Sequence, residues 1–203
     1  MIVLNHTDLR NRQQELDSWD LVGANLVGCD LRNLKLTGKD LKKLNGERSN
    51  FSRANLEKTL LQEANFAHAL MCNSKLSGAK AEKADFDHAD FYQAFLIETN
   101  LSRVSADHAD FMQADLTNAN FQKGSLKHAE FYDATLLNTC FRDAKLHSAR
   151  FVDTNLSATD LKGANLGGDS EPVQWSETTK WPVNLIYVAT NIPTRLKDYL
   201  SSL

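Results

Sequence analysis

Four histidines recur every 20 residues: His68, His88, His108 and His128. Acidic side chains lie close to them in the sequence: Asp85, Asp87, Asp90, Asp107, Asp110 and Glu130. Imidazole and carboxylate groups are zinc ligands, so a fold that stacks residues 20 apart would offer ligands on successive layers. No closed set of four ligands is evident, however. We therefore interpret the histidines as a solvated ladder copied along with a repeat, and predict no metal site.

No motif for covalent or phosphate chemistry accompanies the histidines. The sequence lacks a Gly-rich phosphate loop, an HExxH motif, a CxxC pair and a nucleophile elbow. Its three cysteines, Cys29, Cys72 and Cys140, have no paired spacing, which favours a reducing compartment over a disulfide framework. We expect Cys29 to point inward and the other two to be exposed. The prediction is a non-enzymatic protein with no catalytic residue and no cofactor.

The composition excludes several further classes of protein. The 203 residues carry a net charge of −3, and the mean hydropathy is −0.42. This balance excludes a disordered acidic tail and a strongly basic nucleic-acid binder. No stretch approaches 18 consecutive apolar residues, and the first residues lack the basic region of a secretory signal. We expect a cytoplasmic protein that does not contact a membrane.

A repeat of five residues must position all of these side chains. Of the 31 positions from Leu16 to Leu166 whose numbers end in 1 or 6, 18 are Leu and 9 are Phe. From Ser49 to Ala164 the residues two places earlier are all Ala, Thr, Ser, Val or Gly, and from Asp20 to Asn165 the residues between the two positions are mostly Asp or Asn. A small residue and a Leu or Phe two positions apart lie on one face of a strand, with the residue between them on the other face. Each unit is therefore a very short strand followed by a corner.

The coil has four sides, because residues 20 apart resemble one another. The inward positions Leu36, Leu56, Leu76, Leu96, Leu116, Leu136 and Leu156 form an all-Leu column, and Phe dominates the column that contains Phe91. A separation of 15 would place Lys83 beside His68 and destroy the histidine alignment. Residues 19–168 then form about 7.5 coils, roughly 36 Å long at about 4.8 Å for each stacked strand.

Units such as Ala24-Asn25-Leu26-Val27-Gly28 and Ala89-Asp90-Phe91 resemble the pentapeptide-repeat family. The resemblance implies an all-β solenoid, a right-handed quadrilateral β-helix. It also implies a bacterial, non-enzymatic binding protein that acts as an interaction scaffold. Two alternatives come from subsets of the family: a DNA mimic that binds and protects type II topoisomerases such as gyrase, and a secreted effector or regulator.

Both ends differ from the repeat and are expected to form helical caps. Residues 1–18 suit a short helix over residues 6–18, with Thr7 as its N-cap. Residues 169–203 contain all three prolines and suit two short helices divided by Pro193, either a cap or a dimerisation segment. Inside the repeat, Lys39 occupies an inward slot and predicts a bulge or a widened corner, because an unpaired buried ammonium is costly. Leu44 with Gly46, and Val104 with Ala106, resemble exchanges of a large and a small inner residue.

The outer charges separate by side. Basic residues form one column (Lys43, Lys83, Arg103 and Lys123, with Lys42, Arg142 and Lys162 beside it), and acids gather around the next corner. A narrow acidic rod favours DNA mimicry, whereas the substantial basic column and the low net charge argue against it. No aromatic residues are interleaved with the basic column, so we expect no nucleic-acid partner.

Exposed apolar residues supply the candidate interaction surface. Tyr92, Met112, Tyr132 and Val152 form an outer column one coil apart, and Phe95, Ile97 and Leu137 lie around the neighbouring corner. Aromatic residues and Met with little charge are typical of the centre of an interface. We predict that this surface binds an unidentified protein partner or a second copy of the chain, unless the side chains fold back over the backbone.

Overall fold

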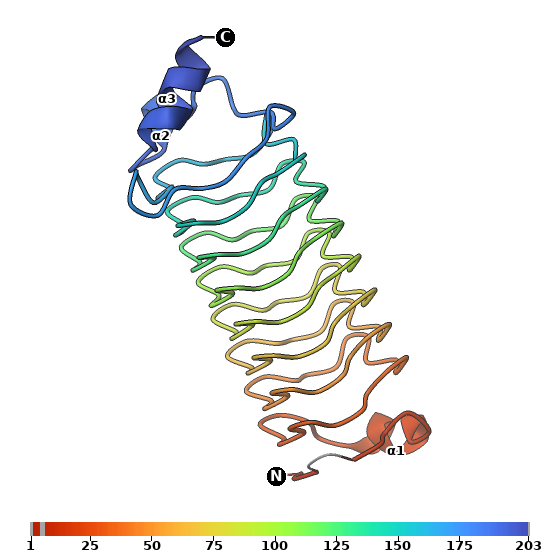
Figure 1. Ribbon diagram of the computed structural model, residues 1–203. Helices are drawn as coiled ribbons and strands as arrows, with labels where there is room; N and C mark the ends of the chain where they lie inside the picture. The colour runs from red at the N-terminus through yellow and green to blue at the C-terminus, as the bar shows by residue number, and fades with distance from the viewer. Residues whose placement is uncertain (1, 5–6, 203) are drawn as a thin grey trace.

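The computed structural model describes residues 2–4 and 7–202 and shows one continuous stack of rectangular coils (Figure 1). Each coil contributes outward residues that form parallel β-bridges with residues 20 positions later, as in Asp90 with Asp110 and Lys75 with Phe95. The fold is the right-handed quadrilateral β-helix that the repeat and the family resemblance predicted. Helices occur only near the ends of the described chain: α1 (Gln13–Ser18), α2 (Leu185–Val188) and α3 (Thr194–Ser201).

Tight turns at the corners make the five-residue unit possible. In each unit the small inward residue donates its N–H to the carbonyl of the preceding Leu or Phe, as Ala94 does to Phe91 at 2.9 Å. The residue just before the small one has a positive φ, for example 58° at His88 and 54° at Gln93. A turn with a hydrogen bond between its first and fourth residues and a positive φ at its third is of the type II kind. Repeating this turn folds the chain into a square.

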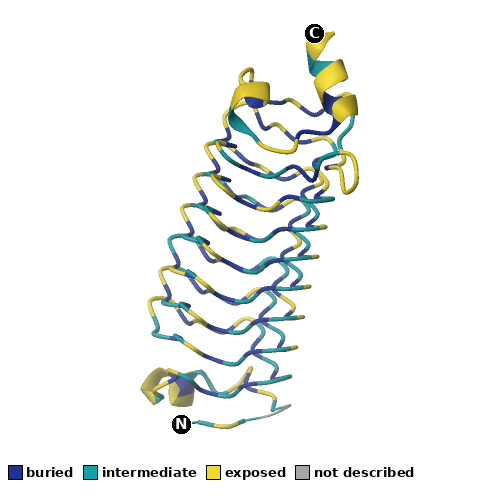
Figure 2. Ribbon diagram, turned by 90° about the vertical axis from the view of Figure 1, so that its left-hand side faces the viewer, coloured by how far each residue is buried: buried dark blue, intermediate teal, exposed yellow. Residues whose placement is uncertain are grey.

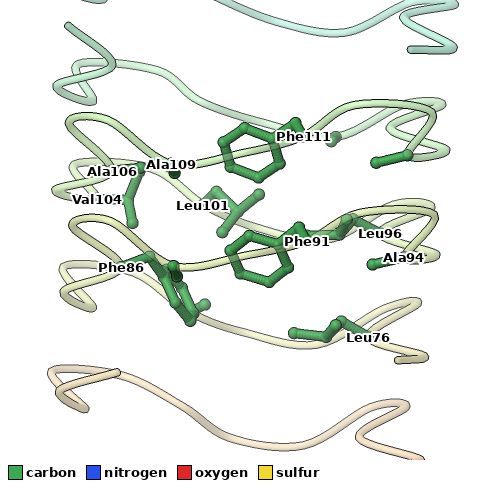
Figure 3. Packing of buried hydrophobic residues seen from close by; sticks show 14 of the residues in the cluster. Leu76, Phe86, Phe91, Ala94, Leu96, Leu101, Val104, Ala106, Ala109 and Phe111 are labelled. Carbon is green, nitrogen blue, oxygen red and sulfur yellow. The ribbon is translucent and has the colours of Figure 1, made fainter. Parts of the chain in front are cut away.

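The core is a column of stacked side chains along the axis of the coil. All nine Phe residues at inward positions are fully buried. Phe91, Phe111, Phe131 and Phe151 stack in parallel, with ring centroids 5.0–5.2 Å apart. Figure 3 shows Phe91 and Phe111 one above the other, with Leu76, Leu96 and Leu101 from other sides of the coil in the same interior. Buried inner positions alternate with exposed corners along the whole stack (Figure 2).

The predicted exchange of inner residues is confirmed at Leu44 and Gly46. A Cβ on Gly46 would lie 3.0 Å from Leu44 Cδ2 and 3.0 Å from Phe66 Cδ1, so Leu44 fills the space that a side chain at position 46 would occupy. Val104 and Ala106 are likewise both buried. Val104 also reaches the next coil, where a Cβ on Gly124 would lie 3.3 Å from Val104 Cγ1.

The prediction of a bulge at Lys39 is wrong. The strand-and-turn pattern continues without interruption from residue 34 to residue 48. The Lys39 ammonium leaves the interior through the open end of the coil and donates to the carbonyls of Leu16 (3.2 Å) and Asp17 (2.6 Å). These carbonyls lie in the last turn of α1, where the helix dipole favours a cation, so the charge is compensated without a change in the backbone.

The N-terminal segment is less helical than expected. Val3 and Asp8 form parallel bridges with Asn25 and Asp30, so this part of the chain adds two further strands to the stack. The N-cap of α1 is Arg12, and the prediction of Thr7 as N-cap is therefore wrong. His6, the first residue of the expected helix, lies outside the described residues. Below the first full coil, α1 covers the hydrophobic end with the buried Leu16.

The C-terminal segment contains the two short helices that Pro193 was expected to separate. Pro193 immediately precedes α3, and its φ of −57° suits the start of a helix. Before the helices, Gln174 and Lys180 pair with Arg150 and Asn155, so the chain closes the last coil before it turns away. Val173, Trp181, Leu185, Ile192 and Leu196 are buried over the end of the core. The segment thus covers the C-terminal end of the core.

Candidate interaction surface

A stack of carboxylates runs along the side of the solenoid that carries the Phe column inside. Asp90, Asp110 and Glu130 occupy successive bridge positions. The stack ends at Arg150, whose Nη1 donates to Glu130 Oε1 at 3.1 Å. At the other end the Cys72 thiol donates to Asp90 Oδ2 at 3.0 Å. Asp110, in the middle, has carboxylates on both sides.

The pKa values follow from this arrangement. Partial burial, together with the charges of Asp90 and Glu130, raises the pKa of Asp110 above its ordinary value. Partial burial and the hydrogen bond to Asp90 raise the pKa of Cys72 to about 11. The Cys72 thiol is therefore neutral at physiological pH and unsuited to nucleophilic attack. A cation that approached this side would relieve the repulsion between the carboxylates.

Beside the carboxylates lies an apolar stripe at the adjoining corner. Tyr92 and Tyr132 are exposed, whereas Met112 and Val152 are half-buried. A shallow groove of about 210 Å³ is lined by Met112, Tyr132 and Val152 together with the paired Glu130 and Arg150. The structure thus brings three of the seven predicted surface residues into one groove.

The other predicted residues lie around the corner. Phe95 is 45% exposed and Leu137 is 52% exposed, whereas Ile97 is half-buried. Phe95 pairs through its backbone with Lys75 and Asp115, which place charges on the coils immediately before and after it. Leu137 lines a second groove, of about 250 Å³, that also contains Asp133 and Asp153. The predicted surface therefore spans two sides of the solenoid.

The histidine ladder lies at the corner that precedes the carboxylates along the chain, whereas the apolar stripe lies at the corner that follows them. The rings of His68, His88, His108 and His128 lie nearly parallel, with centroids 4.8, 4.7 and 4.5 Å apart along the column. Among the described residues no group of three or more His, Cys, Asp or Glu side chains is arranged to hold a metal ion. Asp87 and Asp107 beside the ladder instead accept hydrogen bonds from Ser105 and Ser125, at 2.7 and 2.6 Å.

Two lysines at the basic corner share one acidic neighbour. Lys43 and Lys83 each lie within 4 Å of Glu63. A groove of about 310 Å³ lies beside Lys83, Arg103 and Lys123. Cys29 is buried as predicted, whereas Cys72 and Cys140, which we expected to be exposed, are half-buried.

Sequence reasoning missed two features of the surface. The first is the groove at Leu137, because its opening depends on the backbone conformation of one corner. The second is an apolar patch at the C-terminal cap, where Val183, Ile186 and Tyr187 are exposed. The helical spacing of the tail could have separated these exposed side chains from the buried Leu185.

Eight copies of the pentapeptide-repeat family model match the sequence, over residues 49–87, 83–122, 109–147 and 139–168. Together these matches cover more than half of the chain and coincide with the coils of the structure. The chain belongs to the pentapeptide-repeat family. Such proteins are generally structural or interaction proteins without enzymatic activity.

Solved structures of other pentapeptide-repeat proteins match this chain at low sequence identity and with TM-scores below 0.5. HetL, involved in heterocyst differentiation regulation in the cyanobacterium Nostoc sp. strain PCC 7120, is 23% identical, with a TM-score of 0.40 over 94% of this chain and 83% of that one. QnrB1, a plasmid-mediated fluoroquinolone resistance protein, is 19% identical, with a TM-score of 0.41 over 99% and 96%. A thylakoid-lumen protein of Arabidopsis thaliana is 23% identical, with a TM-score of 0.27 over 61% and 69%. No curated protein matches the sequence.

No helix in the part of the chain that the structure describes is long and apolar enough to cross a membrane.

Proposed function

We propose that this pentapeptide-repeat protein is a non-enzymatic scaffold that binds a protein partner. The docking surface comprises the carboxylate stack (Asp90, Asp110 and Glu130) and the apolar stripe (Tyr92, Met112, Tyr132 and Val152), with Phe95, Ile97 and Leu137 around the corner. The observation that carries the proposal is the groove of about 210 Å³ between Met112, Tyr132 and Val152. A concave apolar centre with a charged rim is the usual anatomy of an interface.

The rigidity of the scaffold supports this role. Each coil is bonded to its neighbours along the axis, so side chains on successive coils keep a fixed spacing of one strand. A preorganised surface of this kind loses little conformational entropy on binding. Aromatic side chains such as Tyr92 and Tyr132 supply contact area with few rotatable bonds.

The test removes apolar contact area without touching the core. In the triple variant Tyr92→Ser/Phe95→Ser/Leu137→Ser all three substituted side chains are exposed, so the solenoid should fold normally. The matched control is Ile186→Ser/Tyr187→Ser on the C-terminal cap, which removes exposed apolar area elsewhere. Partners recovered from the native host, together with the mass measured by light scattering, should change in the triple variant and not in the control. Unchanged partners and unchanged mass in a folded triple variant that also carries Tyr132→Ser, which alters the groove itself, would refute the proposal.

The control variant also tests the alternative that a second copy of the chain is the partner. The exposed Val183, Ile186 and Tyr187 at the C-terminal cap favour a dimer that forms through this end. In that case the cap variant would change the mass and the triple variant would not.

A second candidate, binding to a type II topoisomerase by DNA mimicry, is favoured by one observation. The carboxylates of Asp90, Asp110 and Glu130 stack one strand apart with a single cation, Arg150, at the end of the column. Inhibition of gyrase supercoiling by the wild type, relieved in an Asp90→Asn/Asp110→Asn variant, would support it.

A further inference from the structure

One corner of the solenoid departs from the repeat. From Gly23 to Gly168 the corner residues at intervals of five have φ between 54° and 71°, with the single exception of Ala158. Position 158 is also the only one of these corners occupied by Ala. A positive φ is easiest for Gly and, among other residues, for Asn, Asp and His. Ala158 leaves this region of conformation, and its corner takes a different shape.

The altered corner opens the backbone ladder on one side of one coil. In the preceding coil Leu116 and Asn118 donate to the carbonyls of Thr135 and Leu137, at 2.9 and 2.8 Å. One coil later the equivalent bonds are absent. Among the described residues, six backbone groups on this side therefore have no hydrogen-bond partner. They are the N–H groups of Leu136, Asn138 and Asn155 and the carbonyls of Ala134, Asn155 and Ser157. The other three sides of the same two coils remain paired. We call this opening the seam.

The seam forms a groove on the surface, and its lining is acidic. It has a volume of about 250 Å³ and is lined by Asp133, Ala134, Thr135, Leu136, Leu137, Asp153, Asn155, Ser157 and Ala158. Two of these residues are acidic and none is basic. Ala134 is 7% exposed, whereas the equivalent Ala94 and Ala114 are at most 1% exposed. The groove adjoins the apolar stripe, because Asp133 and Asp153 directly follow Tyr132 and Val152.

Unpaired carbonyls are costly unless a donor or water reaches them. Asp153 Oδ1 already accepts from the hydroxyls of Ser176 and Thr178, and Asp133 Oδ2 accepts from Gln113 Nε2 at 3.4 Å. The three free carbonyls together with Asp133 Oδ1 and Asp153 Oδ2 still form a set of hydrogen-bond acceptors with negative charge, and the three free N–H groups of the seam are left to water. A guanidinium group is planar, always charged and carries five N–H donors, which suits such a set better than an ammonium does. The volume is sufficient for one side chain and too small for an inserted strand. A side chain takes the place of a missing strand elsewhere in the same chain: the Gln13 amide forms hydrogen bonds with the backbone N–H and carbonyl of Lys35.

We propose that the seam receives an arginine side chain of the partner protein. The inference rests on the proposed function, because it makes the seam the charged pocket of the same docking surface. The arginine head would donate to the carbonyls of Asn155 and Ser157 and lie between the carboxylates of Asp133 and Asp153, and its aliphatic part would contact Leu137.

The experiment uses the ¹⁵N-labelled full chain and the probe peptide acetyl-Gly-Arg-Gly-amide, followed by NMR. We expect chemical-shift changes at the amides of residues 134–138 and 153–158. The matched peptide with citrulline in place of arginine keeps the shape and loses the charge, and it should bind about tenfold more weakly. A second matched peptide has lysine in place of arginine. Binding of the citrulline or the lysine peptide as tight as that of the arginine peptide, or chemical-shift changes confined to Asp90 and Asp110, would overturn the proposal.

Two variants close the seam and keep the test decisive. Ala158→Asn and Ala158→Gly both introduce residues that accept a positive φ, so they should restore the bond from Asn138 N–H to the carbonyl of residue 157. Hydrogen exchange at Leu136 and Asn138 should slow by about tenfold or more as these amides become bonded. Arginine binding should be lost in both variants. Binding that persists when these amides are protected would overturn the proposal. A Tyr92→Ser/Phe95→Ser variant, which leaves every residue of the seam unchanged, reports separately on the wider surface in the partner-recovery test.

Discussion

The side-chain amide of Gln13 takes the place of a strand for Lys35. Its Nε2 donates to the carbonyl of Lys35 at 2.8 Å, and its Oε1 accepts from the N–H of Lys35 at 2.8 Å. The first coil has no preceding strand on this side, so both backbone groups would otherwise face the helix unpaired. Lys39 on the next side reaches the carbonyls at the end of α1. Helix α1 therefore closes the N-terminal end of the solenoid with polar contacts as well as with Leu16.

Gln13→Ala should lower the free energy of unfolding by about 1–3 kcal/mol, since two backbone groups lose their partner. Gln13→Glu should also destabilise the protein, because a carboxylate can accept from the Lys35 N–H but cannot donate to its carbonyl. Urea denaturation measures both effects. Gln122→Ala is the control, because the Gln122 side chain makes no hydrogen bond within the described structure, and it should change stability by less than about 0.5 kcal/mol.

Substitution should be able to reverse the exchange of a large and a small inner residue between positions 44 and 46. Gly46→Leu alone overpacks the core, because a Cβ at this position already meets Leu44 and Phe66 at 3.0 Å. We expect it to cost about 1–3 kcal/mol or more. Leu44→Ala alone should cost about 2–5 kcal/mol by leaving a cavity. The double variant Leu44→Ala/Gly46→Leu restores the usual order of a small and a large residue, so thermal denaturation should find it more stable than either single variant. Additive losses would show that the two side chains do not share one space.

The sequence predicts the body of this fold because each five-residue unit repeats the same physical constraints. A small residue, an outward polar residue and a Leu or Phe define the strand, and the separation of 20 between like residues defines the four sides. The structure of the two terminal segments is harder to predict, because no repeat constrains their conformation. Lys39 illustrates the difficulty: its inward position is correctly predicted, but its partners lie in a helix whose place over the open coil no local pattern reveals.

The candidate surface is predictable only in part. The outward register places Tyr92, Met112, Tyr132 and Val152 in one column, and this follows directly from the repeat. How far each side chain remains exposed depends on its neighbours, and Ile97, Met112 and Val152 are half-buried. The seam depends on the φ of Ala158. An alanine among corner residues that otherwise favour or tolerate a positive φ is a visible signal in the sequence. The broken ladder that results is seen only in the three-dimensional structure.

The histidine ladder should not bind zinc. Stacked parallel rings, such as those of His88 and His108 at 4.7 Å, present their nitrogen atoms side by side and do not converge on one point. Addition of equimolar zinc should leave the melting temperature unchanged in calorimetry. A saturable rise that is lost in His88→Asn/His108→Asn would contradict this expectation. Asn is the matched replacement because it tolerates the positive φ of both corners.

Asp110→Asn should stabilise the protein at neutral pH. The pKa of Asp110 is raised in the folded state by burial and by the charges of Asp90 and Glu130. Ionisation therefore costs stability at any pH above the raised pKa, and the cost disappears as the pH falls below the ordinary value of 3.8. The substitution removes the charge and keeps the Oδ1 atom that accepts from the Met112 N–H at 2.8 Å.

Thermal denaturation should accordingly give a higher melting temperature for Asp110→Asn than for the wild type at pH 7, and a smaller difference near pH 3. Asp115→Asn is the control, because Asp115 lies between Phe95 and Thr135 on the ladder and has no carboxylate directly above or below it. Its substitution also keeps the acceptor for the Thr117 N–H. Since Asp115 lacks charged neighbours in its column, the Asp115→Asn variant should not have a higher melting temperature than the wild type at pH 7. If the gain of Asp110→Asn persisted unchanged at pH 3, where the carboxyl is protonated in both states, it would come from packing and not from relief of the carboxylate stack.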